Sequence, residues 1–240
     1  MHTEQKRGLI TFSPFAKLLI LTGLVFLLIG IFSILYPVLF LLITGTNFKE
    51  LANPNFLTDN WSFLTNMSLW QSICVFLVPS LLIAHWCGQN SISSYLFLNR
   101  TPGFLQCLTA IALFFTVTPF IGLTQEWNMQ MSFPESMSGL ESWMREMEDT
   151  GQMMIDKILN VNSTAGWLFV FLVLSVLPGI TEEILFRGVI QRLLLEKFKK
   201  VHLTVWVTAI IFSAIHFQFY GFLPRLLLGA FCGSLLVWSG

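Results

Sequence analysis

Two short groups of polar residues interrupt the apolar stretches in the second half of the chain. The first contains Glu182, Glu183 and Arg187, and the second contains Phe212 and His216. An ionisable side chain near the middle of a membrane costs about 2.5–3.5 kcal/mol on insertion scales, so it is retained where it is paired or functional. A carboxylate and an imidazole can share a proton and activate a water molecule for attack on an amide. The same two side chains could instead bind a divalent metal such as zinc.

Helical spacing separates the two glutamates. Glu183 lies four residues before Arg187, in the order of charges that favours an ion pair on one helical face. Glu182 lies about 100° further back around the helix, outside this pair. Pro178 cannot donate a hydrogen bond to the carbonyl group of Leu174, so we expect the helix to bend one turn before Glu182.

A short basic turn near residue 198 joins the two helices that carry these groups. Counted from this turn, Glu182 lies about 24 Å and His216 about 27 Å along its own helix, at 1.5 Å per residue. Two antiparallel neighbours would therefore hold them at similar depths. Phe212 and His216 are four residues apart and are expected to share a helical face. The alternative is a buried Glu–His–Arg network that only fixes helix packing.

The composition places the elements that carry these residues in a membrane. Of the 240 residues, 55% are apolar and 11% are charged, whereas an average soluble domain is about a quarter charged. The mean hydropathy is +0.72. Basic and acidic residues number 13 each, so no basic excess indicates a nucleic acid partner.

Six apolar stretches are long enough to cross a bilayer as helices. They cover about residues 17–44, 69–87, 104–123, 165–195, 203–219 and 223–238. The sequence therefore predicts an all-α, polytopic transmembrane helical bundle with about six spans. An acidic amphipathic helix is expected in the third loop, from the spacing of Leu140, Met144, Met147, Met154 and Ile158. We expect residues 1–160 to form a three-span region that includes this helix, and residues 161–240 to form the core with the polar groups.

Basic residues predict the orientation, because they concentrate in cytoplasmic loops. They occur before the first span, after the second and after the fourth: Lys6, Arg7, Lys17, Arg100, Arg192, Lys197, Lys199 and Lys200. The N-terminus is therefore expected to be cytoplasmic, in a multi-pass protein of the bacterial inner membrane. On the last span, Gly229 and Gly233 favour close packing within the chain, and Arg225 is expected to anchor its helix at the interface.

The two polar groups together resemble the motifs of the CAAX prenyl protease and bacteriocin-processing family (CPBP, or Abi), which includes the type II CAAX prenyl proteases. The resemblance covers about residues 167–238. It implies an intramembrane protease in which Glu182 and His216 activate the water, with Glu183, Arg187 and Phe212 in support. Members are described both as metalloproteases and as metal-free, glutamate-dependent enzymes. No cofactor is firmly implied, and a zinc ion on Glu182 and His216 stays open.

The resemblance also implies partners and a further motif. The partners would be membrane lipids and a membrane-associated or prenylated peptide, from which the CAAX branch removes the last three residues. Family members carry His-x-x-x-Asn on a later span, where it would hold the oxyanion. The 240 residues contain no such motif, so we expect the natural chain to continue into one or two more spans.

Two other classes of function fit the same residues. A non-catalytic membrane protein of the same fold, acting in bacteriocin immunity or as a scaffold, would keep the packing without the reaction. A proton-coupled transporter would use the intramembrane glutamate and histidine as a relay. The sequence shows no pair of broken helices in matching halves, which disfavours the transporter. The substrate and the oligomeric state cannot be predicted from these residues.

Overall fold

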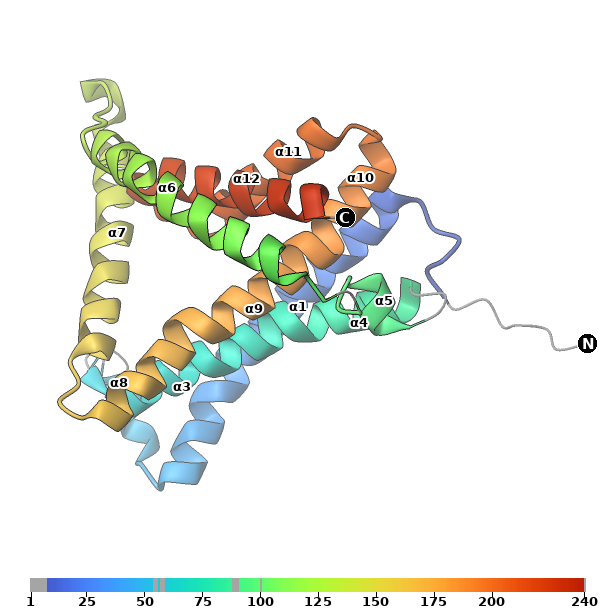
Figure 1. The fold of residues 1–240 in the computed structure, drawn as a ribbon. Helices are drawn as coiled ribbons and strands as arrows, with labels where there is room; N and C mark the ends of the chain where they lie inside the picture. Colours follow the sequence, from blue (N-terminus) through green and yellow to red (C-terminus); the bar gives the residue numbers. More distant parts are fainter. Residues whose placement is uncertain (1–7, 54–55, 57–58, 88–90, 100, 240) are drawn as a thin grey trace, which may run out of the picture. The chain divides into compact units, whose positions relative to one another are not determined.

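The structure is a computed structural model that describes residues 8–53, 56, 59–87, 91–99 and 101–239. Over these residues the chain forms helices joined by turns and loops, with no strand (Figure 1). This confirms the predicted all-α fold class. The basic residues Lys6, Arg7 and Arg100, which contribute to the predicted orientation, lie outside the described residues.

Five helices within the described ranges are long and apolar enough to cross a membrane, which confirms a polytopic protein. They are Pro14–Thr44, Trp61–Cys87, Phe104–Met129, Thr164–Phe198 and Phe219–Trp238. The predicted fifth span is a shorter helix, Val201–Ala214, and the expectation that it extends to about residue 219 is wrong. The reason is local, because Phe217 has a φ angle of 52°, a left-handed conformation that cannot continue a right-handed helix.

The chain divides into two compact units. The first comprises Met1–Leu96 and Met153–Val189, and the second comprises Phe97–Gln152 and Ile190–Gly240. Both units are therefore discontinuous in sequence. The division into residues 1–160 and 161–240 stays a prediction.

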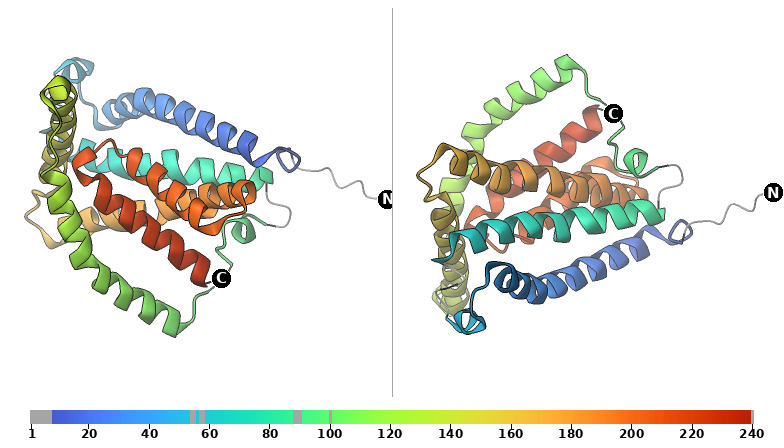
Figure 2. Two further views of the ribbon diagram at one scale, coloured as in Figure 1. Left: turned by 90° about the horizontal axis from the view of Figure 1, so that it is seen from above. Right: turned by 90° about the horizontal axis from the view of Figure 1, so that it is seen from below.

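Three apolar helices form the first unit. The first is α1 (Pro14–Thr44). The second is a continuous helix made of α3 (Trp61–Gln71), η2 (Ser72–Leu77) and α4 (Val78–Cys87). The third is made of α8 (Thr164–Phe171), η4 (Leu172–Val176), α9 (Leu177–Glu183) and η5 (Ile184–Gln191), and its last two residues belong to the second unit. The short elements η1 (Phe48–Ala52) and α5 (Ile92–Tyr95) complete it. The segments η2, η4 and η5 are π-helical. The middle helix, cyan in Figure 2, contacts both of the others.

An aromatic cluster holds α1 against α3 in this unit. Its members are Phe32, Tyr36, Phe40 and Phe63. The Tyr36 hydroxyl donates a hydrogen bond of 2.8 Å to the carbonyl oxygen of Phe63. A buried hydroxyl needs such a partner, so this bond fixes how the two helices meet.

The second unit contains the other helices. They are α6 (Phe104–Met129), η3 (Glu135–Met137), most of α7 (Ser138–Leu159), α10 (Arg192–Phe198), α11 (Val201–Ala214), η6 (Phe219–Gly221) and α12 (Phe222–Ser239). Helix α12 packs against α11 and α6. At Gly229 a Cβ atom would lie 3.2 Å from Phe212 and 3.3 Å from the Cα atom of Ala209, so glycine permits the close approach of α11 and α12. This confirms the predicted packing role of Gly229.

The acidic amphipathic helix is confirmed as α7. Two residues of its predicted apolar face, Met144 and Ile158, are buried. Its charged residues lie mostly on the exposed remainder, as expected for a helix that covers apolar surface without crossing the membrane.

Candidate active site

The predicted ion pair of the first motif is present in the first unit. The Arg187 guanidinium Nη1 lies 3.0 Å from Glu183 Oε1, as a pair four residues apart. Arg187 is buried, with 6% of its side chain exposed, whereas 45% of the Glu183 side chain is exposed. Glu182, which is partly buried, lies on the adjacent position of α9. The arginine therefore forms an ion pair with the second of two neighbouring carboxylates.

The segment α9 that carries both glutamates is enclosed by two π-helical segments. It has seven residues, with η4 ending at Val176 before it and η5 starting at Ile184 after it. Pro178 lacks the N–H group that would donate to Leu174, so a regular α-helical ladder cannot run through this point. The disturbance predicted at Pro178 takes the form of a wider turn just before it. Such π-helical turns occur frequently at functional sites.

His216 lies in the second unit, in a turn beyond the end of α11. The prediction that it belongs to the same regular helix as Phe212 is wrong, because α11 ends at Ala214. The two residues are nevertheless in contact, with ring centroids 5.1 Å apart in an edge-to-face arrangement. The His216 Nδ1 atom lies 2.7 Å from the carbonyl oxygen of Phe212.

This contact determines which nitrogen of His216 can act as a base. A carbonyl oxygen can only accept a hydrogen bond, so Nδ1 carries the proton. In the neutral ring the lone pair then resides on Nε2. The helix end that precedes the turn thus orients the imidazole and selects its tautomer.

Side chains from other elements hold the turn in place. Asn128, which is 3% exposed, donates a hydrogen bond of 2.8 Å to the carbonyl oxygen of Phe219 and accepts one of 2.7 Å from the N–H group of Leu223. Gln125 donates to the carbonyl oxygen of Tyr220 at 3.2 Å. The sequence analysis missed both residues, because it ended the third span near residue 123, whereas α6 continues to Met129. Two amide side chains three residues apart at the end of an apolar helix were the available signal.

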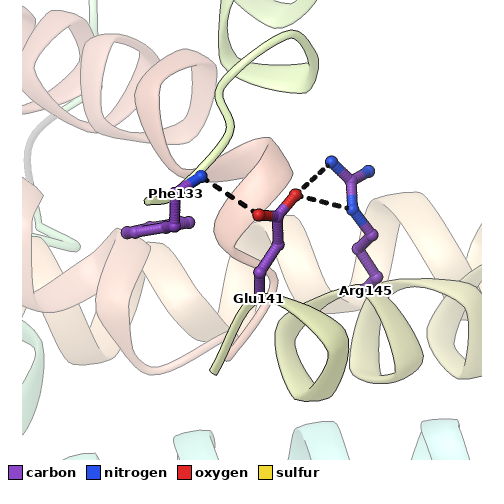
Figure 3. A network of polar contacts seen from close by, with 3 residues as sticks. All are labelled: Phe133, Glu141 and Arg145. Carbon is purple, nitrogen blue, oxygen red and sulfur yellow. Dashed lines mark hydrogen bonds and ion pairs between the residues drawn. The ribbon is translucent and has the colours of Figure 1, made fainter. Parts of the chain in front are cut away.

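An ion pair on α7 contacts Tyr220, the residue whose carbonyl oxygen is bonded to Gln125. Glu141 accepts two hydrogen bonds from Arg145, of 3.1 and 2.7 Å, and one of 3.0 Å from the N–H group of Phe133 (Figure 3). The hydrogen bonds from Arg145, followed by that from Phe133, lower the pKa of Glu141 below its ordinary value. The Arg145 guanidinium also stacks on the Tyr220 ring, 4.6 Å from its centroid.

The zinc ion considered for Glu182 and His216 stays a prediction. A catalytic zinc ion takes three protein ligands and keeps a fourth position for water or substrate. No group of three or more His, Cys, Asp or Glu side chains that could hold a metal ion occurs in the described part of the chain.

Comparison with known families gives a match over the segment that contains both motifs. Residues 164–240 match the Rce1-like family, described as type II CAAX prenyl endopeptidase Rce1-like. This confirms the resemblance predicted for residues 167–238. Searches of curated proteins and of solved structures found no match. The matched segment supports protease activity in general, in a multi-pass membrane protein.

The site residues thus fall into two groups. The first unit brings together Glu183 and Arg187, with Glu182 adjacent, and the second unit brings together Phe212 and His216. The proximity of Glu182 and His216, expected from their equal distances to the basic turn, stays a prediction. The assignment of catalytic roles to these residues also stays a prediction.

Proposed function

We propose that the protein is an intramembrane endopeptidase of the CAAX type, which hydrolyses a peptide bond in a membrane-associated or lipidated peptide. The observation that carries the proposal is that one family match, over residues 164–240, contains both the Glu182–Arg187 motif and the Phe212–His216 motif. The tautomer of His216 supports it, since Nε2 is the nitrogen that can accept a proton.

In the proposed mechanism, Glu182 and His216 activate one water molecule. The water oxygen attacks the carbonyl carbon of the scissile amide, while its proton passes to Glu182 or to Nε2 of His216. The tetrahedral intermediate then collapses, the C–N bond breaks, and the proton is delivered to the departing amine. Glu183, paired with Arg187, serves as a supporting group, and Phe212 holds the imidazole through its carbonyl oxygen.

The proposed setting is the bacterial inner membrane, with the N-terminus in the cytoplasm. Lys199 and Lys200 in the turn between α10 and α11 support this orientation, because basic turns remain on the cytoplasmic side. The substrate class follows from the family match, so we propose a peptide with a prenylated cysteine near its C-terminus. Membrane lipids are the other partner, since five helices are long and apolar enough to cross the bilayer.

The decisive experiment measures peptide hydrolysis by the full natural protein in proteoliposomes. The substrate is a fluorogenic peptide with an S-farnesyl cysteine followed by three residues. Glu182→Gln and His216→Ala are each expected to lower kcat by about 10²–10⁴-fold, the usual contribution of a positioned acid or base. Treatment with a chelator tests the zinc alternative, since loss of activity would indicate a metal on Glu182 and His216.

Glu196→Gln is the matched control, because Glu196 forms an ion pair with Arg192 four residues away and lies outside both motifs. It should retain full activity. Wild-type hydrolysis that survives both Glu182→Gln and His216→Ala would refute the assignment of these residues. Absence of hydrolysis in folded wild-type protein would favour a non-catalytic membrane protein of the same fold.

A further inference from the structure

The turn that carries His216 also fixes the side chain of an arginine. Arg225 donates two hydrogen bonds to Gln218, of 3.3 Å from Nη1 to the carbonyl oxygen and of 2.8 Å from Nη2 to the side-chain Oε1. Gln218 is two residues from His216, so their Cα atoms are at most about 7.6 Å apart. The guanidinium is therefore part of the same turn as the proposed base.

The position of Arg225 is unfavourable for a residue that only anchors a helix. It is the fourth residue of α12, where the helix dipole disfavours a cation. It lies partly buried in a segment long and apolar enough to cross the membrane, where a charge is costly. The guanidinium packs directly over Gly221, where a Cβ atom would collide with Nη2. The absence of a side chain at Gly221 thus leaves room for the Arg225 guanidinium beside the turn.

The chemistry of the group indicates the kind of ligand it would bind. A guanidinium is a planar donor that matches a carboxylate through two parallel hydrogen bonds. At present Nη2 is bonded to the neutral amide oxygen of Gln218. A carboxylate oxygen in the place of this amide oxygen would form a charge-assisted bond, which is about twice as strong. Displacement of Gln218 would exchange a hydrogen bond to a neutral acceptor for one to a charged acceptor.

We infer that Arg225 is the binding site for the C-terminal carboxylate of the peptide substrate, with Gln218 Oε1 occupying the place of one carboxylate oxygen before the substrate binds. The inference rests on the proposed endopeptidase function. An extended tripeptide spans at most about 10 Å, so a carboxylate held on the His216 turn leaves the scissile bond close to that turn. Arg225 would then select substrates that end a few residues after the bond that is cleaved.

Binding tests the site independently of catalysis. The probes are two peptides with an S-farnesyl cysteine and three further residues, identical except that one ends in a carboxylate and the other in a carboxamide. Their affinities are measured on the full natural protein carrying Glu182→Gln, in phosphatidylcholine nanodiscs. We expect the carboxylate peptide to bind about 10- to 100-fold more tightly, the value of hydrogen bonds to a charged group.

Variants assign this preference to Arg225. Arg225→Gln should reduce the preference to less than about 2-fold, and Arg225→Lys should retain part of it, since a lysine keeps the charge without the planar geometry. Gly221→Ala should weaken it by displacing the guanidinium. Arg192→Gln removes a cation elsewhere in the second unit and should keep the full preference, because Arg192 contacts Glu196 and Phe97.

Hydrolysis of the same two peptides separates this inference from the proposed function. Equal affinities and equal KM values for both peptides, or a preference that Arg225→Gln leaves intact, would overturn the carboxylate site even if both are cleaved. A preference in binding without any hydrolysis would support the site and refute the endopeptidase. If Arg225→Gln does not fold, the wild-type comparison and Arg225→Lys still decide.

Discussion

The segment that carries the glutamates and the turn that carries the histidine are positioned by different kinds of contact. Glu183 is held by Arg187 on the same helix, and Thr181 bonds to the carbonyl oxygen of Leu177 one turn earlier. The turn around His216 depends instead on Asn128, which lies far away in the sequence. Local spacing therefore determines the first arrangement, whereas the second requires several helices to be in place.

The largest effect on stability is expected from breaking the local ion pair. Glu183→Gln leaves the buried Arg187 guanidinium without this counter-ion in an apolar helix, so we expect the free energy of unfolding to fall by about 3 kcal/mol, the lower end for a buried charge that loses its partner. The double variant with Arg187→Met should lose less, because neither charge remains. Unfolding of the purified protein in mixed micelles measures both differences.

Glu196→Gln provides the matched comparison for this prediction. The Arg192–Glu196 pair has the same four-residue spacing, with a longer separation of 3.6 Å and side chains that are 30% and 37% exposed. Its loss should change stability by less than about 1 kcal/mol. A double variant as unstable as Glu183→Gln alone would contradict the idea that a buried guanidinium without this counter-ion causes the loss.

A smaller effect on stability, with an effect on catalysis, is expected from the long-range contact. Asn128→Ala removes the partners of two backbone groups, at Phe219 and Leu223, and should lower the free energy of unfolding by about 2 kcal/mol. Because these groups define the turn that carries His216 and holds Arg225, kcat for peptide hydrolysis should fall and KM for a carboxylate peptide should rise. Steady-state kinetics on the folded variant separate the two constants.

Asn66→Ala is the control for Asn128→Ala. The Asn66 amide donates a hydrogen bond to the carbonyl oxygen of Ser62 within its own helix, so its loss should leave kcat unchanged. An equal loss of kcat in the two variants would mean that the turn does not depend on Asn128 in particular.

The smallest effect is expected from pH. The pKa of Glu141 is lowered in the folded protein by the hydrogen bonds from Arg145 and Phe133, so the folded state favours the ionised carboxylate. The resulting stabilisation is fully present above the ordinary pKa of 4.5 and is lost as the pH falls through the lower pKa of the folded state. The difference in melting temperature between wild type and Glu141→Gln should therefore shrink as the pH falls below 4.5. A difference that stays constant with pH would contradict this account.

The sequence predicts the fold class and the local part of the site for clear physical reasons. Apolar length is sufficient to locate membrane-crossing helices, and a spacing of four residues is sufficient to pair Glu183 with Arg187. The end of α11 could not be predicted in the same way, because residues 215–219 contain no glycine or proline that would mark a helix end. The left-handed conformation of Phe217 is uncommon for its residue type, so the sequence does not predict it. Asn128 was missed because the third span was expected to end near residue 123, although the pair Gln125 and Asn128 was a signal at the end of the apolar helix.

The two π-helical segments on either side of α9 give its seven residues a particular rotational setting. A π-helical turn contains one residue more than an α-helical turn. Conversion of η4 to a regular α-helix would therefore turn α9 by about 100° around its axis and shift it by about 1.5 Å. Neighbouring residues on a helix differ by the same 100°. Glu182 would therefore face the direction that Glu183 faces now. The identity of the glutamate that faces a given direction is thus set by where the extra residue lies, outside the motif itself.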